Sequence, residues 1–314
     1  MDNKPVLRVF VPMTFEGVTS VAILEEITSP DIHMDIRYTG HLDFREYENF
    51  SGADMIMILG APYKGYPLPE AFYTSVNVPF MDFIHCATHG ETIEGDHIIS
   101  MVNTEADPIK EVCQFLNLHP ESSVLSKHLT FTDKAWQMIE AVNAYRIWDW
   151  ETNNTTKLLL AMYQASHKWL PNLLRGLSLQ EAVKAYAPVI KGQMEKMKDY
   201  IVRKREMTKV YHITFEGVPC TLKVVYADEY INELANELLN LEPTSSPVIV
   251  CVGRTTKSGD VLSIRTKVVN AGKVAYMINE GNGKETVASV FTGAGYAEIL
   301  GNAIVRKLMS HSGE

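Results

Sequence analysis

Short apolar segments alternate with segments of helical periodicity through the first 120 residues of the chain. The candidate strands, rich in β-branched or long apolar residues, are Val6–Val11, Ile32–Tyr38, Asp54–Leu59 and Val78–Ile84. After the first of them, Gly17–Ile27 repeats its apolar residues at helical spacing. This alternation predicts an α/β fold with a parallel, doubly wound sheet.

Ligands of such sheets bind beyond the carboxyl ends of the strands. The segments that follow predicted strands are therefore the places to look for a site, and they are residues 12–17, 60–65 and 85–97. A helix is predicted at Asp107–Asn117, because Asp107 can cap the first turn and Pro108 suits the first helical position.

The pattern changes twice in the second half of the chain. From residue 132 to residue 200 it is mostly helical, and Ser178 with Glu181 fits a capping box for a helix that should reach about Arg205. Strand-like segments then return around a helix. The predicted elements are Val210–Thr214, Thr221–Val225, Val248–Val252 and Val261–Thr266 as strands, and Asn232–Leu241 as the helix.

These changes predict three parts in a chain whose 314 residues suit two domains. We expect an α/β domain at residues 1–177, a helical connector at 178–207, and a smaller α/β domain at 208–314. A cleft is expected between the two domains.

The charge balance restricts the partners. There are 29 basic and 38 acidic residues, a net charge of -9, which disfavours tight binding to long nucleic acid but leaves room for a local basic pocket. No apolar run is long enough to span a bilayer, and the N-terminus lacks the pattern of a secretory signal. The expected location is the cytoplasm, without a membrane partner.

The cysteines are far apart and form no CxxC pair; they are Cys86, Cys113, Cys220 and Cys251. This spacing predicts buried, reduced thiols and argues against a zinc site or a disulfide framework.

The C-terminal part carries the most specific pattern. Residues 259–266 read GDVLSIRT and are followed by NAGKVAYMI and then GNGKETVASVFTG. This succession resembles the DHH-associated domain of DHH phosphoesterases, in which a strand with a Ser-x-Arg element precedes a helix, a Gly-Gly-Gly-His loop and an alanine-containing strand.

The resemblance implies a phosphate-binding site in this domain. Its residues would be Ser263, Arg265, Gly281, Asn282, Gly283 and Lys284. Glycines let backbone N–H groups approach a phosphate, and an arginine offers a forked donor to the same anion. The alternative is that Arg265 pairs with a carboxylate such as Glu285 and that Lys284 is solvated.

The N-terminal half resembles the same family in layout, but most metal ligands are replaced. The family's His-x-Asp-x-Asp-Gly element corresponds to PMTFEG at residues 12–17, its second motif falls at Gly60, and its Asp-His-His falls at residues 84–86. A further aspartate falls near Arg146. The vestigial positions are Thr14, Glu16, Gly60, His85 and Arg146.

Members of this family hydrolyse phosphoesters with two divalent cations, usually manganese. Threonine and glycine cannot supply the lost negative charge, and Arg146 would place a cation where a metal should lie. We therefore predict no cofactor and no confidently assigned catalytic residue. The protein is expected to bind a nucleotide, a short oligonucleotide or a protein partner through the interdomain cleft.

Two alternatives stay open. The first is an active phosphodiesterase of the nanoRNase or single-strand exonuclease type, dependent on manganese or magnesium, with a rebuilt metal site. Its ligand candidates are His85, His89, Asp96 and His97. The second is a structural subunit of a larger assembly. The sequence does not decide between a monomer and a homodimer.

Overall fold

The structure is a computed structural model that describes residues 4–39, 42–76, 82–166, 174, 176–256, 259–293 and 300–310. The chain divides into two compact units, residues 1–194 and 195–314, and the division lies within helix α8 (Ala187–Glu206). In these described ranges, no helix combines the length and apolar character that crossing a membrane requires.

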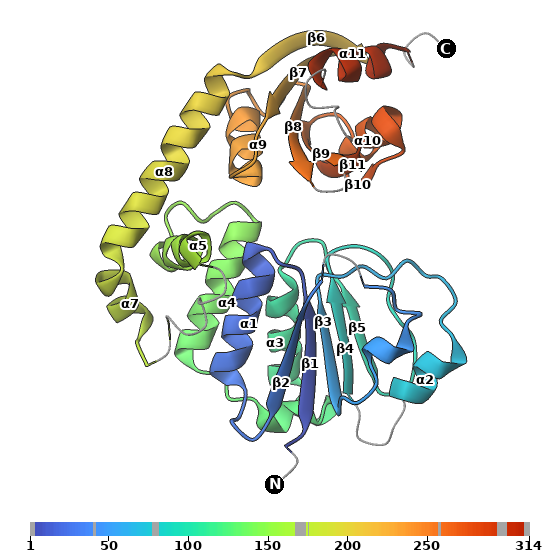
Figure 1. Ribbon diagram of the computed structural model, residues 1–314, viewed down its shortest axis with the longest axis vertical. Helices are drawn as coiled ribbons and strands as arrows, with labels where there is room; N and C mark the ends of the chain where they lie inside the picture. Colours follow the sequence, from blue (N-terminus) through green and yellow to red (C-terminus); the bar gives the residue numbers. More distant parts are fainter. Residues whose placement is uncertain are drawn as a thin grey trace. The chain divides into compact units, whose positions relative to one another are not determined.

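The first unit is built on a five-stranded parallel sheet in the order β2-β1-β3-β4-β5 (Figure 1). Its strands are β1 (Val6–Val11), β2 (His33–Tyr38), β3 (Met55–Leu59), β4 (Asp82–Ala87) and β5 (Ile98–Val102). The predicted parallel α/β class is confirmed. The strand predicted at Val78–Ile84 corresponds to β4, although residues 77–81 lie outside the described residues, and β5 was not predicted.

Helices pack on one face of this sheet (Figure 1). Of these, α1 (Phe15–Ile27) and α3 (Pro108–Leu118) contact the strands, and α4 (Asp133–Arg146) and α5 (Asn154–Ser166) pack on α1. A side-chain hydrogen bond caps the start of each of these helices, as α1 and α3 illustrate. The Thr14 hydroxyl accepts from the Gly17 N–H at the start of α1, and the Asp107 carboxylate accepts from the Ile109 N–H at the start of α3, as predicted.

The opposite face is covered by an aromatic cluster rather than by long helices. Its large rings are Phe44, Phe50, Phe72 and Phe83. Three of them come from the segment 42–76, which contains a short 3₁₀ turn (Tyr47–Asn49) and α2 (Glu70–Val76). Phe50 meets Phe72 edge to face at 5.4 Å between ring centroids, a favourable aromatic geometry.

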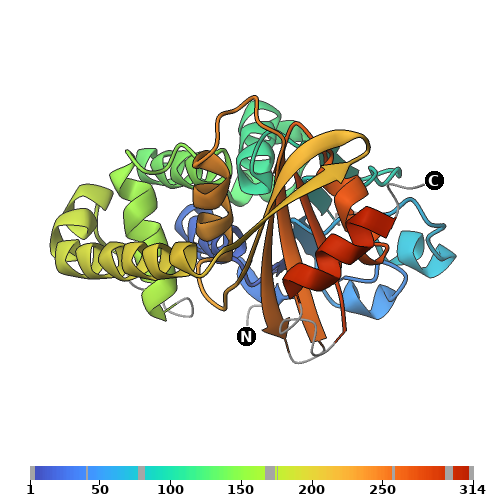
Figure 2. The same cartoon turned by 90° about the horizontal axis from the view of Figure 1, so that it is seen from above.

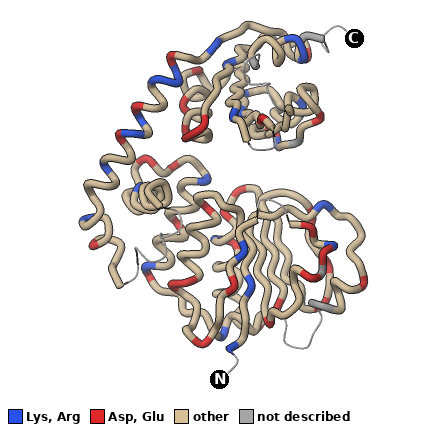
Figure 3. Tube along the Cα trace, viewed as in Figure 1, with Lys and Arg blue, Asp and Glu red and all other residues tan. Residues whose placement is uncertain are grey.

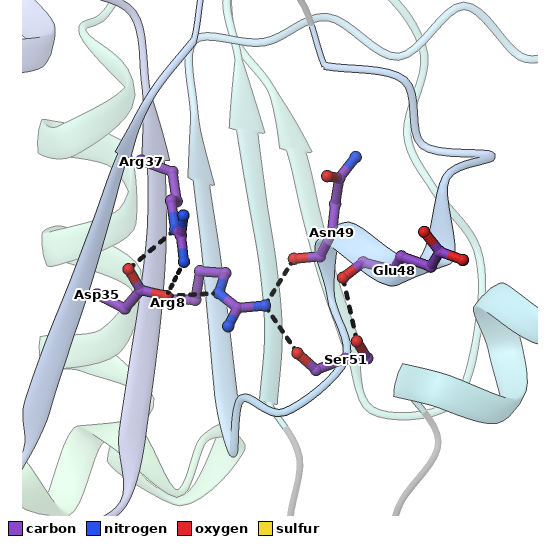
Figure 4. A network of polar contacts seen from close by, with 6 residues as sticks. All are labelled: Arg8, Asp35, Arg37, Glu48, Asn49 and Ser51. Atoms are coloured by element: carbon purple, nitrogen blue, oxygen red, sulfur yellow. Dashed lines mark hydrogen bonds and ion pairs between the residues drawn. The ribbon is translucent and has the colours of Figure 1, made fainter.

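Arg8 ties this covering segment to the sheet (Figure 4). One terminal nitrogen of its guanidinium donates to the carbonyls of Asn49 and Ser51, each at 2.8 Å. Its Nε donates to Asp35 on the neighbouring strand at 2.9 Å, and Arg37 contacts the same carboxylate. These two arginines keep the pKa of Asp35 below its usual value, against the opposing effect of burial.

The helix predicted from Ser178 to about Arg205 is two helices, α7 (Leu179–Ala185) and α8. The predicted capping box of Ser178 and Glu181 is confirmed. The break follows from Pro188, which has no N–H to continue the hydrogen bonds of α7 and which is tolerated in the first turn of a new helix. Along α8, lysines and arginines are interspersed with acidic residues (Figure 3).

The second unit has a six-stranded mixed sheet in the order β10-β11-β9-β8-β7-β6. Its strands are β6 (Lys209–Phe215), β7 (Val218–Tyr226), β8 (Val248–Thr256), β9 (Gly259–Lys267), β10 (Asn282–Gly283) and β11 (Val287–Phe291). β7 and β8 pair in parallel, joined by α9 (Ile231–Asn240). The four predicted strands and the predicted helix of this unit are confirmed.

Two apolar clusters occupy the two faces of this second sheet. α9 packs over one face with residues such as Val250 and Val252. α10 (Ala271–Asn279) and α11 (Leu300–Ser310) pack over the other with residues such as Leu262 and Ile264 (Figure 2). Because side chains alternate along each strand, successive residues belong to opposite faces of the sheet and to different clusters.

Tyr200 fastens the C-terminal half of α8 to the second unit. Its hydroxyl donates to Asp228 Oδ1 at 2.6 Å and accepts from the N–H groups of Asp228 and Glu229 at 3.0 and 3.2 Å. Its ring also meets that of Tyr230 edge to face. One hydroxyl thus satisfies three polar groups of the turn that leads into α9.

The Tyr200→Phe variant is expected to lose about 1–3 kcal/mol of unfolding free energy, because it leaves this turn without its acceptor and donor. Urea unfolding followed by circular dichroism measures the loss. Tyr276→Phe is the matched control, since Tyr276 is 66% exposed and should change little. Equal stability of the two variants would contradict the role of the Tyr200 hydroxyl.

Candidate functional site

The carboxyl edge of the parallel sheet collects four of the five vestigial positions. Thr14 and Glu16 follow β1, Gly60 follows β3, and Arg146 ends α4, where its Nη2 donates to the Thr104 carbonyl beyond β5 at 3.2 Å. The N–H of Gly60 donates to the Cys86 carbonyl at 2.8 Å, and a φ of +81° favours glycine there.

Asp107 also lies at this edge, and the sequence indicated only its capping role. Its side chain is buried, and its backbone N–H donates to Asn143 Oδ1 of α4 at 3.1 Å. Within the described part of the chain, Asp107 Oδ2 and Arg146 Nε are buried without a hydrogen-bond partner. Asp107 follows β5, a strand that was not predicted, so its place at the carboxyl edge of the sheet was missed.

The electrostatics of this edge follow from burial. Burial and, after it, the Glu16 carboxylate raise the pKa of Asp107, the Ile109 N–H and Arg146 lower it, and the net result is a pKa of about 7. Burial likewise raises the pKa of the Cys86 thiol to about 12. Near neutral pH, Asp107 is therefore partly protonated and Cys86 is an uncharged thiol.

This set of donors does not fit a two-metal centre. Each divalent cation needs several anionic oxygen or imidazole ligands, whereas Thr14 and Gly60 provide no charge and Arg146 is a cation. In the described ranges, no three His, Cys, Asp or Glu side chains are grouped so that they could hold a metal.

His85 lies within β4 and not in the segment that follows the predicted strand. β4 continues through Ala87 because Cys86 pairs with Leu59 of β3 and Ala87 with Val102 of β5. His85 is therefore inside the strand, fully buried against Phe44 on the aromatic face. Its Nδ1 lies 2.9 Å from Ser100 Oγ, and its Nε2 lies 2.9 Å from the Ala61 carbonyl.

The candidates for a rebuilt metal site do not converge. His89 follows the carboxyl end of β4, whereas Asp96 and His97 precede the amino end of β5. Because β4 and β5 are parallel, these positions lie at opposite edges of the sheet, roughly 17 Å apart for a strand of five residues.

The predicted phosphate residues of the second unit divide between the two faces of its sheet. Ser263 and Arg265 alternate along β9 with Leu262 and Ile264, which belong to the cluster under α10. Ser263 and Arg265 therefore face the side of α9. There Arg265 Nη2 donates to Asn232 Oδ1 of α9 at 3.0 Å.

Lys284 extends this face towards the sheet edge. Val287 pairs with Arg265 across β11 and β9, and the Lys284 N–H donates to the Val287 carbonyl at 2.7 Å. Arg265, Val287 and Lys284 thus form one transverse row across three chain segments.

The glycines allow close packing against β11. A Cβ at Gly283 would overlap Ala288, and one at Gly281 would lie 2.5 Å from Val290 Cβ. The Gly281 N–H donates to the Ala275 carbonyl, so this N–H and that of Lys284 are already engaged. The two glycines line a cavity of about 440 Å³ beside α10; the Asn282 side chain lies outside the described part.

No family model matches the sequence, and no curated protein matches it. Solved structures do match in fold. An exopolyphosphatase-related protein from Bacteroides fragilis has a TM-score of 0.53 at 12% identity, over 98% of this chain and 93% of that one. The DHH domain of a protein described as a member of a ribosomal protein family has a TM-score of 0.55 at 11% identity, over 98% and 87%.

RecJ from Thermus thermophilus, solved with Mn²⁺, has a TM-score of 0.53 at 11% identity, over 98% of this chain and 52% of RecJ. Identities this low speak for the fold and not for the activity. Each match spans 98% of this chain and so includes both the parallel sheet with its helices and the second α/β unit. The chain therefore has the fold of the DHH superfamily.

Proposed function

We propose that this protein binds nucleotides or short oligonucleotides through their phosphates at Ser263, Arg265 and Lys284, without two-metal hydrolysis. The observation that carries the proposal is the transverse row of Arg265, Val287 and Lys284 on one face of the sheet. Two basic side chains in one row, with the Ser263 hydroxyl in the next, provide donors suited to a phosphate.

The local contacts support an anion ligand. The hydrogen bond from Arg265 Nη2 to Asn232 Oδ1 holds the guanidinium of Arg265 against α9 in one direction. A planar guanidinium held in one direction suits two phosphate oxygens. Arg265 and Lys284 are about two strand spacings apart, roughly 10 Å between backbones, and both side chains are long enough to reach one phosphate between them.

The carboxyl edge of the parallel sheet supports the absence of hydrolysis. Arg146 adds a positive charge beside the buried Asp107, where the family's pattern would have a metal ligand. That arrangement opposes metal occupancy through charge repulsion.

Titration of mononucleotides and short oligonucleotides tests the phosphate site. Arg265→Ala and Lys284→Ala are each expected to weaken binding about ten- to hundredfold, the equivalent of about 1.5–3 kcal/mol for a charge-assisted contact. Arg265→Lys keeps the charge but loses the fork, so an intermediate affinity is expected.

Arg306→Ala is the matched control, because it removes the same charge from an exposed position on α11, on the other face of the sheet. Unchanged affinity in both Arg265→Ala and Lys284→Ala, with thermal unfolding intact, would remove this site from consideration.

The competing activity is manganese- or magnesium-dependent phosphodiester hydrolysis. Metal content and manganese-dependent hydrolysis of short oligonucleotides measure it directly. Two manganese ions located by anomalous scattering near Thr14, Glu16 and Gly60 would overturn the noncatalytic interpretation of this edge.

A further inference from the structure

We propose that the face of β9 and β11 that α9 leaves uncovered binds a single-stranded oligonucleotide of at least two nucleotides, with one base stacked on Phe291. This inference rests on the proposed phosphate site at Arg265 and Lys284 and adds base recognition at a second place on the same face. The occupant is single-stranded because a stacked base must be free of a pairing partner.

Phe291 is an exposed aromatic side chain with a backbone floor beneath it. It ends β11 and is 48% exposed. A Cβ built at Gly259 would lie 2.6 Å from Phe291 Cζ, so the ring lies directly against this glycine. The ring is thereby supported on one side and accessible from another, as a stacking platform for a base requires.

Phe291 shares its face with the phosphate site. Ala288 and Val290 of β11 are buried in the cluster under α10, so Val287, Ser289 and Phe291 all face the other way. The strand register places Phe291 opposite Val261, Ser289 opposite Ser263, and Val287 opposite Arg265. An aromatic row, a hydroxyl row and a basic row therefore follow one another along the strands.

The spacing of these rows selects the length of the ligand. Neighbouring rows are two residues apart, about 7 Å, so the row of Phe291 is about 14 Å from the row of Arg265. In a mononucleotide one sugar joins the base to its phosphate, which is too short a link for this span. A trinucleotide, or a dinucleotide that carries a terminal phosphate, can place a base on Phe291, a phosphodiester near Ser263 and Ser289, and the next phosphate at Arg265.

Charge complementarity favours nucleic acid over other extended chains. Arg254 pairs with Val261 in the row of Phe291 and is exposed, which adds a further basic residue. The strand positions of β9 and β11 on this face contain no carboxylate; they are Gly259, Val261, Ser263, Arg265, Lys267, Val287, Ser289 and Phe291. In a chain of net charge -9, this is a local basic strip suited to phosphates.

Fluorescence titration with dinucleotides and trinucleotides that contain 2-aminopurine tests the inference, because the emission of this base falls when it stacks. Phe291→Leu is expected to weaken trinucleotide binding about five- to hundredfold and to abolish the change in emission. Binding of a mononucleotide should be unchanged. Arg265→Ala should weaken both ligands. Tyr276→Leu, on an exposed aromatic residue of α10, is the control, and thermal unfolding checks that each variant is folded.

The outcomes separate this inference from the function on which it rests. If Phe291→Leu leaves trinucleotide affinity and emission unchanged while Arg265→Ala weakens both ligands, base stacking is wrong and the phosphate site stands. If the wild-type protein binds neither ligand, or if Arg265→Ala changes neither affinity, the phosphate site and this inference both fail.

Discussion

The His85→Leu variant is expected to lose about 2–6 kcal/mol of unfolding free energy. Leucine fills much of the space but leaves the Ser100 hydroxyl and the Ala61 carbonyl without their partner in a fully buried place. Each unsatisfied group costs about 1–3 kcal/mol. A residue at a ligand position that acted only through a metal would show no such loss in metal-free protein.

The direction of each hydrogen bond at His85 can be assigned from its neighbours. The Ile93 N–H donates to Ser100 Oγ at 2.8 Å, so the Ser100 proton is free to point to Nδ1. The Ala61 carbonyl can only accept, so Nε2 carries the ring proton. Burial lowers the pKa of His85, which agrees with this neutral ring.

Urea unfolding at several pH values measures both effects. Because the folded pKa lies below the ordinary 6.5, the unfolded chain binds the proton more readily, and the contribution of His85 to wild-type stability should fall as the pH drops below about 6.5. His85→Leu should lack this part of the pH dependence. His89→Leu is the control on an exposed histidine. A loss below 1 kcal/mol in His85→Leu would contradict the hydrogen-bonded role.

A double variant with Ser100→Ala sharpens the test. In the double variant, the Ser100 hydroxyl that His85→Leu would leave without an acceptor is itself absent. The double variant should therefore lose less than the sum of the two single losses. Strict additivity would show that His85 and Ser100 do not act together.

The sequence predicted the elements whose evidence is local. The caps of Asp107 and of Ser178 with Glu181 depend on residues two or three positions away, and both are confirmed. The fully buried strand β3 is a continuous apolar run and was found, whereas β5 is only half-buried along its length and has Ser100 at its centre. Its apolar signal was too weak to separate it from the preceding loop.

The candidate sites depended on contacts that no local pattern contains. The end of β4 is fixed by pairing with β3 and β5, so an error of three residues moved His85 from a strand into a loop. Likewise, the sequence predicted that Gly281 and Gly283 belong to an anion-binding loop. The structure shows that both glycines lie so close to β11 that a Cβ at either position would collide with it. A glycine in a sequence can indicate either close packing against a neighbouring segment or a turn of the backbone. The sequence alone does not distinguish between these two causes.

Replacing Asp107 by asparagine is expected to make the protein more stable than the wild type at pH 8. At pH 5 this advantage in unfolding free energy should be smaller. The folded pKa of about 7 lies above the unfolded value of 3.8. Between these values the unfolded chain releases its proton more readily, so the contribution of Asp107 to wild-type stability falls as the pH rises, and the loss is complete above about 7. From pH 5 to pH 8 this amounts to about 2–3 kcal/mol.

Asparagine isolates the charge from the cap. It is as good an N-cap as aspartate, so the hydrogen bond from the Ile109 N–H can persist without a titrating carboxyl group. The measurement is the unfolding free energy in urea at pH 5 and pH 8 for both proteins. Asp133→Asn, at an exposed carboxylate in the first turn of α4, is the control for loss of a surface charge. Parallel pH profiles for wild type and Asp107→Asn would contradict a raised pKa.

Arg146 can then be tested as the internal counter-charge of Asp107. Arg146 lowers the pKa of Asp107, whereas burial and Glu16 raise it, so Arg146→Gln should raise that pKa. The variant should then lose more unfolding free energy between pH 5 and pH 8 than the wild type does. In the Asp107→Asn background, Arg146→Gln should leave the pH profile of that background unchanged in this range, because the carboxyl group of Asp107 is no longer there to respond. An equal effect of Arg146→Gln in both backgrounds would show that Arg146 acts on some other group and would remove the electrostatic reason for its place at this edge.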